Sequence, residues 1–239
     1  MSRGGPRRPK NENRSISSSG GKRRKTVLVK AQGRGLSSTR WLQRQLNDPY
    51  VLAAKEAGYR SRAAFKLIEL NEKFDIFSIG DKVVDLGAAP GGWSQVASEN
   101  IGKHGEVLGL DLQFIDPING VKFLQMDVYA KETIKSILET LNGPVNVVLS
   151  DMATRSTGHA STDHLRVIDL AEAAADLAAQ ILAPNGVFIA KVFKGGTESE
   201  LLKLLKKQYE RVKHAKPPSS RATSAEEYVI ARGFRYSKY

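Results

Sequence analysis

The chain has 239 residues, of which 41% are apolar and none is cysteine, and its formal net charge is +12. This length suits one domain with a core of its own, and the lack of cysteine excludes disulfides, thiolate nucleophiles and cysteine-bound zinc. The sequence contains no run of about 18 apolar residues, so we predict no membrane span. Its four histidines do not form an H-E-x-x-H pattern, so they give no indication of a metal site.

The N-terminal segment 1–44 holds the whole positive excess. It contains 13 Lys/Arg and one acid, Glu12, whereas residues 45–239 contain 24 residues of each sign. Almost no large apolar side chain precedes Val27, so we predict a disordered basic tail over 1–44 and a folded domain over 45–239. Such a tail favours a polyanionic partner, nucleic acid first, although a solubilising tail is an alternative. It lacks the amphipathic face of a transit peptide, so we expect a cytoplasmic protein.

Beyond the tail, helical and strand patterns alternate. The sequence predicts helices at 38–46, 51–74 with a break near Gly58, 91–100, 131–141, 163–182 and 198–209. It predicts strands at 82–86, 106–112, 121–128, 145–150, 187–193, 211–215 and 228–232. This alternation indicates an α/β fold with a mostly parallel, doubly wound sheet. Because no helix separates the last two strands, we expect them to form an antiparallel C-terminal hairpin at one edge.

The segment K-V-V-D-L-G-A-A-P-G-G-W-S-Q from Lys82 to Gln95 joins a strand to a helix through glycines. Such a turn lets the backbone approach a ligand and presents the free N–H groups of a helix N-terminus. The spacing is not G-x-G-x-x-G, and Pro90 lies inside the loop, so a dinucleotide is disfavoured as the ligand. A purely structural glycine turn is the alternative.

Acidic residues end four of the predicted strands, where the ligands of a doubly wound sheet bind. They are Asp85, Asp111, Asp127 and Asp151, and we expect them to line one rim. Asp111 follows Gly92 by 19 residues, close to the usual distance of an acid that binds ribose hydroxyls. Asp127 could accept a hydrogen bond from an adenine amino group. Helix capping is the structural alternative for each acid.

Lys191 lies within the apolar strand V-F-I-A-K-V-F and therefore needs a partner or a neutral amine. Asp151, at the end of the neighbouring strand, could pair with it. Lys66 also lies in apolar sequence, on an earlier helix. A structural Lys–Asp pair remains an alternative to a catalytic one.

Taken together, D-L-G-A-A-P-G-G-W-S-Q, L-S-D-M-A and K-V-F resemble the FtsJ/RrmJ family of S-adenosyl-L-methionine-dependent RNA ribose 2′-O-methyltransferases. R-S-R-A-A-F-K-L at 60–67 and S-S-R-A-T-S-A-E-E-Y at 219–228 also resemble family motifs. The resemblance extends from about Asp48 to Gly233 and implies a Rossmann-like class I methyltransferase fold. It is greatest for the bacterial members that methylate a uridine of large-subunit (23S) ribosomal RNA.

The resemblance implies site residues position by position. The family's Lys-Asp-Lys-Glu catalytic set falls on Lys66, Asp151, Lys191 and Glu226, with the adjacent Glu227 as an alternative to the last. The cofactor S-adenosyl-L-methionine would be bound by Gly91, Trp93, Asp111, Asp127 and Asp151, without a metal ion. The implied partner is ribosomal RNA within the large subunit, and we expect a monomer.

The implied reaction is attack of a ribose 2′-oxygen on the methyl carbon of a sulfonium. We expect Lys191 to take the hydroxyl proton, Lys66 to disfavour the charged form of Lys191 by repulsion, and Asp151 and Glu226 to orient these groups. The basic tail, Arg60, Arg62 and the segment 203–216 are the expected contacts to RNA phosphates, although the lysines of 203–207 also suit an ordinary solvated helix face.

Three other functions compete with this one. A transfer-RNA methyltransferase would share the catalytic residues. A non-catalytic ribosome-assembly factor would not need all four of them. A methyltransferase of base or amino nitrogens would favour an N/D-P-P-Y/F loop, where this chain has Ser150-Asp151-Met152-Ala153.

Overall fold

The computed structural model describes residues 46–154, 157–194 and 199–235, and the compact unit that contains nearly all of them begins at Asp48. The tail at 1–44 and most of the helix predicted at 38–46 lie outside the described residues, so both stay predictions.

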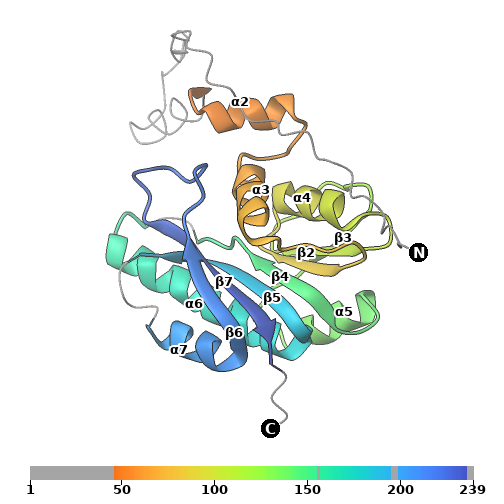
Figure 1. Cartoon of the computed structure of the whole chain (residues 1–239). Helices are drawn as coiled ribbons and strands as arrows, with labels where there is room; N and C mark the ends of the chain where they lie inside the picture. The colour runs from red at the N-terminus through yellow and green to blue at the C-terminus, as the bar shows by residue number, and fades with distance from the viewer. Residues whose placement is uncertain (1–45, 155–156, 195–198, 236–239) are drawn as a thin grey trace, which may run out of the picture. The chain divides into compact units, whose positions relative to one another are not determined.

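A seven-stranded sheet forms the centre of the described unit, with strand order β3-β2-β1-β4-β5-β7-β6 (Figure 1). The strands are β1 Lys82–Leu86, β2 Glu106–Asp111, β3 Val121–Gln125, β4 Val145–Ser150, β5 Leu182–Phe193, β6 Tyr209–Ala215 and β7 Glu226–Phe234. β1 to β5 run parallel, and β7 runs antiparallel to both β5 and β6. The predicted doubly wound sheet and its antiparallel C-terminal pair are therefore confirmed. β7 lies between β5 and β6, so of this C-terminal pair only β6 is an edge strand, and β3 forms the opposite edge of the sheet.

Helices cover both faces of the sheet (Figure 1). They are α2 Pro49–Glu56, α3 Ala63–Phe74, α4 Gly92–Ile101, α5 Thr133–Thr140, α6 Ala160–Ile181 and α7 Ser199–Gln208. Apolar side chains of α3 and α4 form one core with one face of the sheet, and those of α5, α6 and α7 form a second core with the other face. Within the described ranges no helix is long and apolar enough to cross a membrane.

The predicted helix 51–74 is divided into α2 and α3, as its glycine suggested. Gly58 has φ of 78°, a left-handed conformation that ends the first helix. At the start of α2, the Asp48 side chain accepts a hydrogen bond from the Tyr50 N–H at 3.1 Å, and Pro49 occupies the first turn. These local signals explain why α2 begins where it does.

Two strand boundaries differ from the sequence prediction. β3 ends at Gln125, so Asp127 lies in the following loop, where its Oδ1 atom accepts a hydrogen bond from the Tyr129 N–H at 3.0 Å. β5 begins at Leu182 rather than Val187, because Leu182 pairs with Val145 before an irregularity in the β4–β5 register. The Asn185-Gly186 turn signal therefore marks an irregularity within the strand.

Candidate active site

The segment between β1 and α4 forms a tight loop at the carboxyl end of the sheet. Gly91 is the N-cap of α4 with φ of 108°, a conformation that favours glycine. A Cβ atom on Gly91 would lie 2.6 Å from Cδ1 of Ile118, so the loop is also closely packed. Asp111 fixes the loop from the end of β2, where its Oδ2 atom accepts a hydrogen bond from the Ala89 N–H at 2.9 Å. The loop is therefore held in one shape beside a carboxylate.

A pocket of about 690 Å³ lies beside this loop, at the carboxyl ends of β1, β2 and β4. Three of the predicted acids line it, namely Asp111, Asp127 and Asp151. Most of its apolar lining comes from Leu86, Leu110, Leu112, Met126, Val128, Met152 and Leu170. Its place is the usual ligand site of a doubly wound sheet, and its volume and mixed lining suit a small cofactor.

The fourth acid, Asp85, does not join this rim, contrary to the expectation from the strand ends. Its side chain is fully buried and accepts a hydrogen bond from the Ser94 hydroxyl at 2.6 Å, on the α4 side of the sheet. Side chains alternate along a strand, so Asp85 faces α4 while Val84 and Leu86 face the opposite core. Burial raises the pKa of Asp85 to about 7, although the hydrogen bond from Ser94 opposes the rise.

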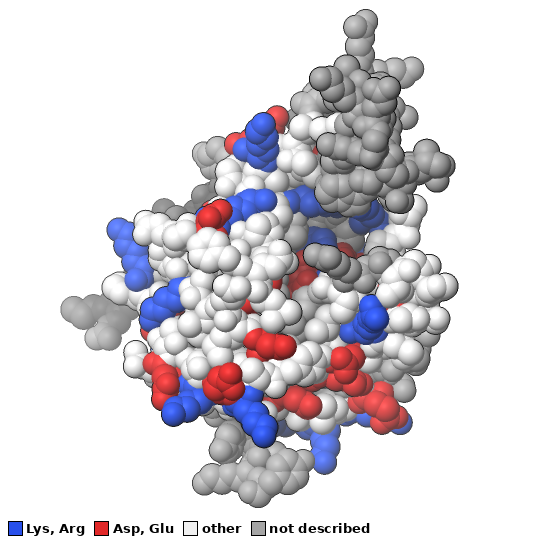
Figure 2. All heavy atoms as spheres, turned by 180° about the vertical axis from the view of Figure 1, so that it is seen from behind, with Lys and Arg blue, Asp and Glu red and all other residues white. Residues whose placement is uncertain are grey.

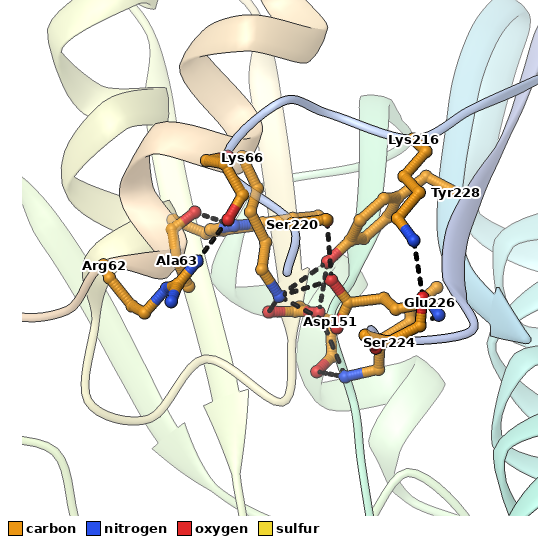
Figure 3. Close-up of polar contacts among 12 residues, drawn as sticks. Arg62, Ala63, Lys66, Asp151, Lys216, Ser220, Ser224, Glu226 and Tyr228 are labelled. Carbon is orange, nitrogen blue, oxygen red and sulfur yellow. Dashed lines mark hydrogen bonds and ion pairs between the residues drawn. The ribbon is translucent and has the colours of Figure 1, made fainter. Parts of the chain in front are cut away.

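The four residues assigned to catalysis come together in one cluster, and Figure 3 shows three of them, Lys66, Asp151 and Glu226. Lys191, on β5, places its Nζ atom 3.0 Å from Oδ1 of Asp151 and donates to the Asp151 carbonyl oxygen at 2.7 Å. Lys66, on α3, lies 3.7 Å from Oδ2 of the same carboxylate and 2.9 Å from Oε1 of Glu226. The lysines thus share one carboxylate, and Asp151 also lines the pocket.

The register of β7 distinguishes Glu226 from Glu227. Glu226 and Tyr228 lie on the face of the strand that points toward Lys66, because side chains two residues apart share a face. Glu227 points to the other face, where its Oε2 atom lies 3.9 Å from Nδ1 of His214. The geometry therefore places Glu226, and not Glu227, in the cluster.

Tyr228 is a member of the cluster that sequence reasoning quoted within a motif without giving it a role. Its hydroxyl donates to Oδ1 of Asp151 at 2.8 Å and lies 3.0 Å from Nζ of Lys66. Burial, together with the charges of Asp151 and Glu226, raises the pKa of the Tyr228 phenol well above its ordinary value, so the hydroxyl stays a donor. The sequence feature that could have placed Tyr228 in the cluster is its two-residue spacing from Glu226, because side chains two residues apart on a strand share a face.

Asp151 stays ionised although its side chain is only 16% exposed. Burial raises the pKa of its carboxyl, but the charges of Lys191 and Lys66 and the hydrogen bond from Tyr228 together outweigh it, and the pKa lies below its ordinary value. The two lysines, the two carboxylates and the tyrosine of the cluster thus satisfy one another by hydrogen bonds.

Gly91 and Trp93 do not line the pocket beside them. The Trp93 side chain is buried, its Nε1–H donates to the Ala63 carbonyl oxygen at 2.8 Å, and its ring packs 5.5 Å from that of Tyr228. Trp93 therefore joins α4 to α3 and β7. Direct contact of Gly91 and Trp93 with a cofactor stays a prediction.

The model of the FtsJ-like methyltransferase family matches residues 59–234, the span that contains the loop, the pocket and the whole cluster. The chain belongs to the FtsJ-like methyltransferase family. The resemblance found in the motifs is therefore confirmed over most of the chain.

Individual members of the FtsJ-like family support this assignment. The chain is 57% identical over 224 residues to Ribosomal RNA large subunit methyltransferase E of Paramagnetospirillum magneticum, covering 91% of this chain and 92% of that protein. It is 53% identical over 227 residues to the protein of the same name from Parvibaculum lavamentivorans, covering 90% and 89%. Among solved structures, a ribosomal RNA methyltransferase from Plasmodium falciparum superposes with a TM-score of 0.65 at 30% identity, covering 74% of this chain and 98% of that one.

Two arginines of the FtsJ-like motif at 60–67 are engaged within the domain. The Arg60 guanidinium donates to the backbone carbonyl oxygens of Pro90, Asp116 and Pro117. Arg62 pairs with the Asp48 carboxylate and donates to the Ser219 carbonyl oxygen. Arg60 thereby holds the glycine loop, and the expected contacts of both arginines with RNA stay predictions.

The motif at 219–228 is held directly against α3. Glu69, one helical turn beyond Lys66, accepts hydrogen bonds from the Ser219 N–H at 2.8 Å and from its hydroxyl at 2.6 Å. The next residue, Ser220, donates to Oε1 of Glu226 at 2.9 Å. The loop between β6 and β7 is thus tied to the helix that carries Lys66, and this tie sets the Lys66–Glu226 distance.

The described residues contain no group of three or more His, Cys, Asp or Glu side chains arranged to hold a metal ion.

Proposed function

We propose that this chain transfers a methyl group from S-adenosyl-L-methionine to the ribose 2′-oxygen of a uridine in large-subunit ribosomal RNA. The observation that carries the proposal is the Lys66–Asp151–Lys191–Glu226 cluster, which borders the pocket in a chain of the FtsJ-like family. The names of the relatives from P. magneticum and P. lavamentivorans support the ribosomal RNA substrate. The enzyme would act as a monomer on the large subunit, in the bacterial cytoplasm.

The pocket suits S-adenosyl-L-methionine. Asp111 and Asp127 provide carboxylates for ribose hydroxyls and an amino group, and the apolar lining provides a slot for an adenine ring. A Cβ atom on Gly87 would lie 2.6 Å from Cγ of Met152, which lines the pocket, so glycine keeps this wall in place. When bound, the cofactor supplies a methyl group on a positively charged sulfur, a charge that disfavours a second cation beside it.

Lys191 is the proposed general base. Its Nζ atom lies at the carboxylate that borders the pocket, and the residue is 7% exposed, so water has little access to the amine. A neutral amine there can take the proton of a 2′-hydroxyl as the oxygen attacks carbon. Lys66 and the cofactor's sulfur repel a positive charge at this amine, whereas the Asp151 carboxylate attracts it.

The other members of the cluster position these groups. Asp151 accepts from Lys191 and Tyr228 through the same Oδ1 atom, so its orientation fixes the Lys191 amine. Glu226 holds Lys66, and its charge balances that of the second lysine. The acceptor oxygen would then meet a fixed amine and a fixed methyl group, which lowers the entropic part of the barrier.

The test is methyl transfer from labelled S-adenosyl-L-methionine, offered separately to naked ribosomal RNA, large subunits that lack the modification, and transfer RNA. We expect 2′-O-methyluridine in large-subunit RNA. Lys191→Ala should lower kcat by roughly a thousandfold, the range of general-base catalysis, with unchanged cofactor affinity. Lys194→Ala, which removes an exposed lysine three residues away, is the matched control and should keep wild-type turnover.

Each other outcome replaces one part of the proposal. Label only on transfer RNA would keep the chemistry and change the substrate. Cofactor binding without transfer to any RNA would favour a ribosome-assembly factor that has lost catalysis. Full turnover by Lys191→Ala would remove Lys191 from the role of base.

A further inference from the structure

A second hollow, of about 510 Å³, lies at the end of β6 and β7 that is remote from the catalytic cluster. Arg211 on β6 is directly opposite Arg232 on β7, and Lys213 is opposite Ile230. Ile230 belongs to the core shared with α3, so the alternation of the strands directs these cations to the α3 side of the sheet. The end of α3 contributes Lys73 and Phe74 to the same hollow.

The charge in this hollow is unbalanced. Four cations line it, namely Lys73, Arg211, Lys213 and Arg232, and Glu210 is its one acidic residue. Among the described residues, none of the four forms an ion pair, and Arg232 donates only to the Phe74 carbonyl oxygen. Elsewhere the signs are mixed: on the face shown in Figure 2, acidic and basic side chains both reach the surface.

This arrangement is unfavourable in the free protein. Like charges directly opposite each other on antiparallel strands repel, as in the pair of Arg211 and Arg232. Lys73, Arg211 and Lys213 are exposed, so their donors can reach a ligand in the hollow. An anion bound between them would satisfy these donors and reduce the repulsion, and phosphate is one of the anions that the arginine guanidinium binds through two parallel hydrogen bonds.

The position of the hollow suggests which part of an RNA would supply the phosphate groups. Glu226 and Arg232 are six residues apart on β7, which corresponds to about 20 Å along the strand. This distance exceeds the reach of the nucleotide that would be methylated, but a structured RNA can span it. Proteins commonly orient such an RNA through contacts to its backbone.

We propose that the hollow lined by Lys73, Arg211, Lys213 and Arg232 binds the phosphate backbone of the substrate RNA, about 20 Å from the methyl-transfer site. The inference rests on the proposed function, because it assumes an RNA substrate in the active site. It assigns the enzyme a second contact that selects large, structured RNA over short fragments.

The test compares Arg211→Gln/Lys213→Gln with Lys131→Gln/Lys135→Gln, which removes two exposed positive charges from α5 and the turn before it, on the opposite face of the sheet. Binding to a large ribosomal RNA fragment, to assembled large subunits and to a short stem-loop with the same target uridine is measured over a range of salt concentrations. Methyl transfer by the wild type is measured in the same samples. The first variant should bind the large fragment roughly tenfold more weakly, with a salt slope lower by about 1.5. It should bind the stem-loop and S-adenosyl-L-methionine like the wild type, and the control variant should behave like the wild type throughout.

Three results would overturn the inference. Equal binding of the large fragment by both variants would leave the hollow without a role in RNA binding. Weaker binding to assembled subunits, with unchanged binding to naked RNA, would indicate an acidic protein segment as the partner. Equal losses on the stem-loop and the large fragment would show no distal contact. A wild-type protein that methylates no ribosomal RNA in the same samples would refute the proposed function instead.

Discussion

The carboxylate of Glu226 lies 2.9 Å from the ammonium group of Lys66, although the two residues are 160 positions apart in the chain. One comes from a helix that precedes the sheet, and the other begins the last strand described. The contact depends on the loop between β6 and β7, which Glu69 holds against α3. The distance between Lys66 and Glu226 therefore depends on the packing of this loop against α3.

Glu226→Gln and Glu227→Gln form a matched pair of variants. The first removes the charge that balances Lys66, whereas the second removes a charge on the opposite face of β7. We expect Glu226→Gln to lower kcat by about tenfold, less than loss of the base, because Glu226 acts through Lys66. Glu227→Gln should stay within about twofold of the wild type. Steady-state methyl transfer under cofactor saturation measures both, and the reverse order would place Glu227 in the site.

Tyr228→Phe should affect both activity and stability. The hydroxyl is buried between Lys66 and Asp151, and its removal leaves each of them one hydrogen-bond partner short. The free energy of unfolding should fall by about 1–2 kcal/mol, and kcat should fall several-fold. Denaturant unfolding and methyl transfer provide the measurements.

The control for this variant is Tyr59→Phe, which loses an exposed hydrogen bond to Glu99 and none to a member of the cluster. It should leave kcat unchanged. If both tyrosine variants lost the same activity, the effect of Tyr228 would be a general one on folding and not one on the cluster.

Asp85 predicts a pH dependence of stability. Burial raises the pKa of Asp85 to about 7, whereas an unfolded carboxyl titrates near pH 4. Between these values the folded protein holds a proton that the unfolded chain has lost, so the free energy of unfolding falls as pH rises from about 4 to 7. The loss from this group is on the order of 4 kcal/mol.

Asp85→Asn removes this titration while keeping an acceptor for Ser94. The difference in unfolding free energy between wild type and Asp85→Asn should therefore change across this window and stay constant above about pH 8. Chemical denaturation at several pH values would measure it. If the unfolding free energies of the two proteins changed in parallel between pH 4 and 7, Asp85 would be ionised in the folded state over this range.

Deletion of residues 1–40 tests the predicted basic tail. It removes 12 Lys/Arg and one acid, so RNA binding should weaken and its salt dependence should flatten, because fewer counterions are released. A chain of full length with these 12 residues replaced by serine is the control for length. Cofactor affinity should be the same in all three proteins, and RNA binding that survives both changes would assign the tail another role.

Much of this architecture could be predicted because its signals are local. The alternation of apolar runs with amphipathic segments predicted the doubly wound sheet, and the glycine loop predicted the turn before α4. The catalytic set came from motif resemblance, and the register of β7 then separated Glu226 from Glu227. Alternation along a short, fully buried strand is harder to see in a sequence, which is why Asp85 was placed on the wrong side.

Contacts between distant segments account for what the sequence could not reveal. The guanidinium of Arg60 donates to three backbone carbonyl oxygens, and no pattern of residue types in the sequence predicts such acceptors. The cationic hollow likewise brings together the end of α3 and two late strands. The sequence predicted that β6 and β7 pair, but not the register that places Arg211 opposite Arg232.

The place of β7 in the sheet also orders the assembly of the enzyme during synthesis. This strand is later in the sequence than both of its neighbours, yet it pairs with each of them. Until it emerges from the ribosome, β5 and β6 have no partner between them, and neither Glu226 nor Tyr228 is available to Lys66. A nascent chain that can already form the pocket would therefore still lack its complete catalytic cluster.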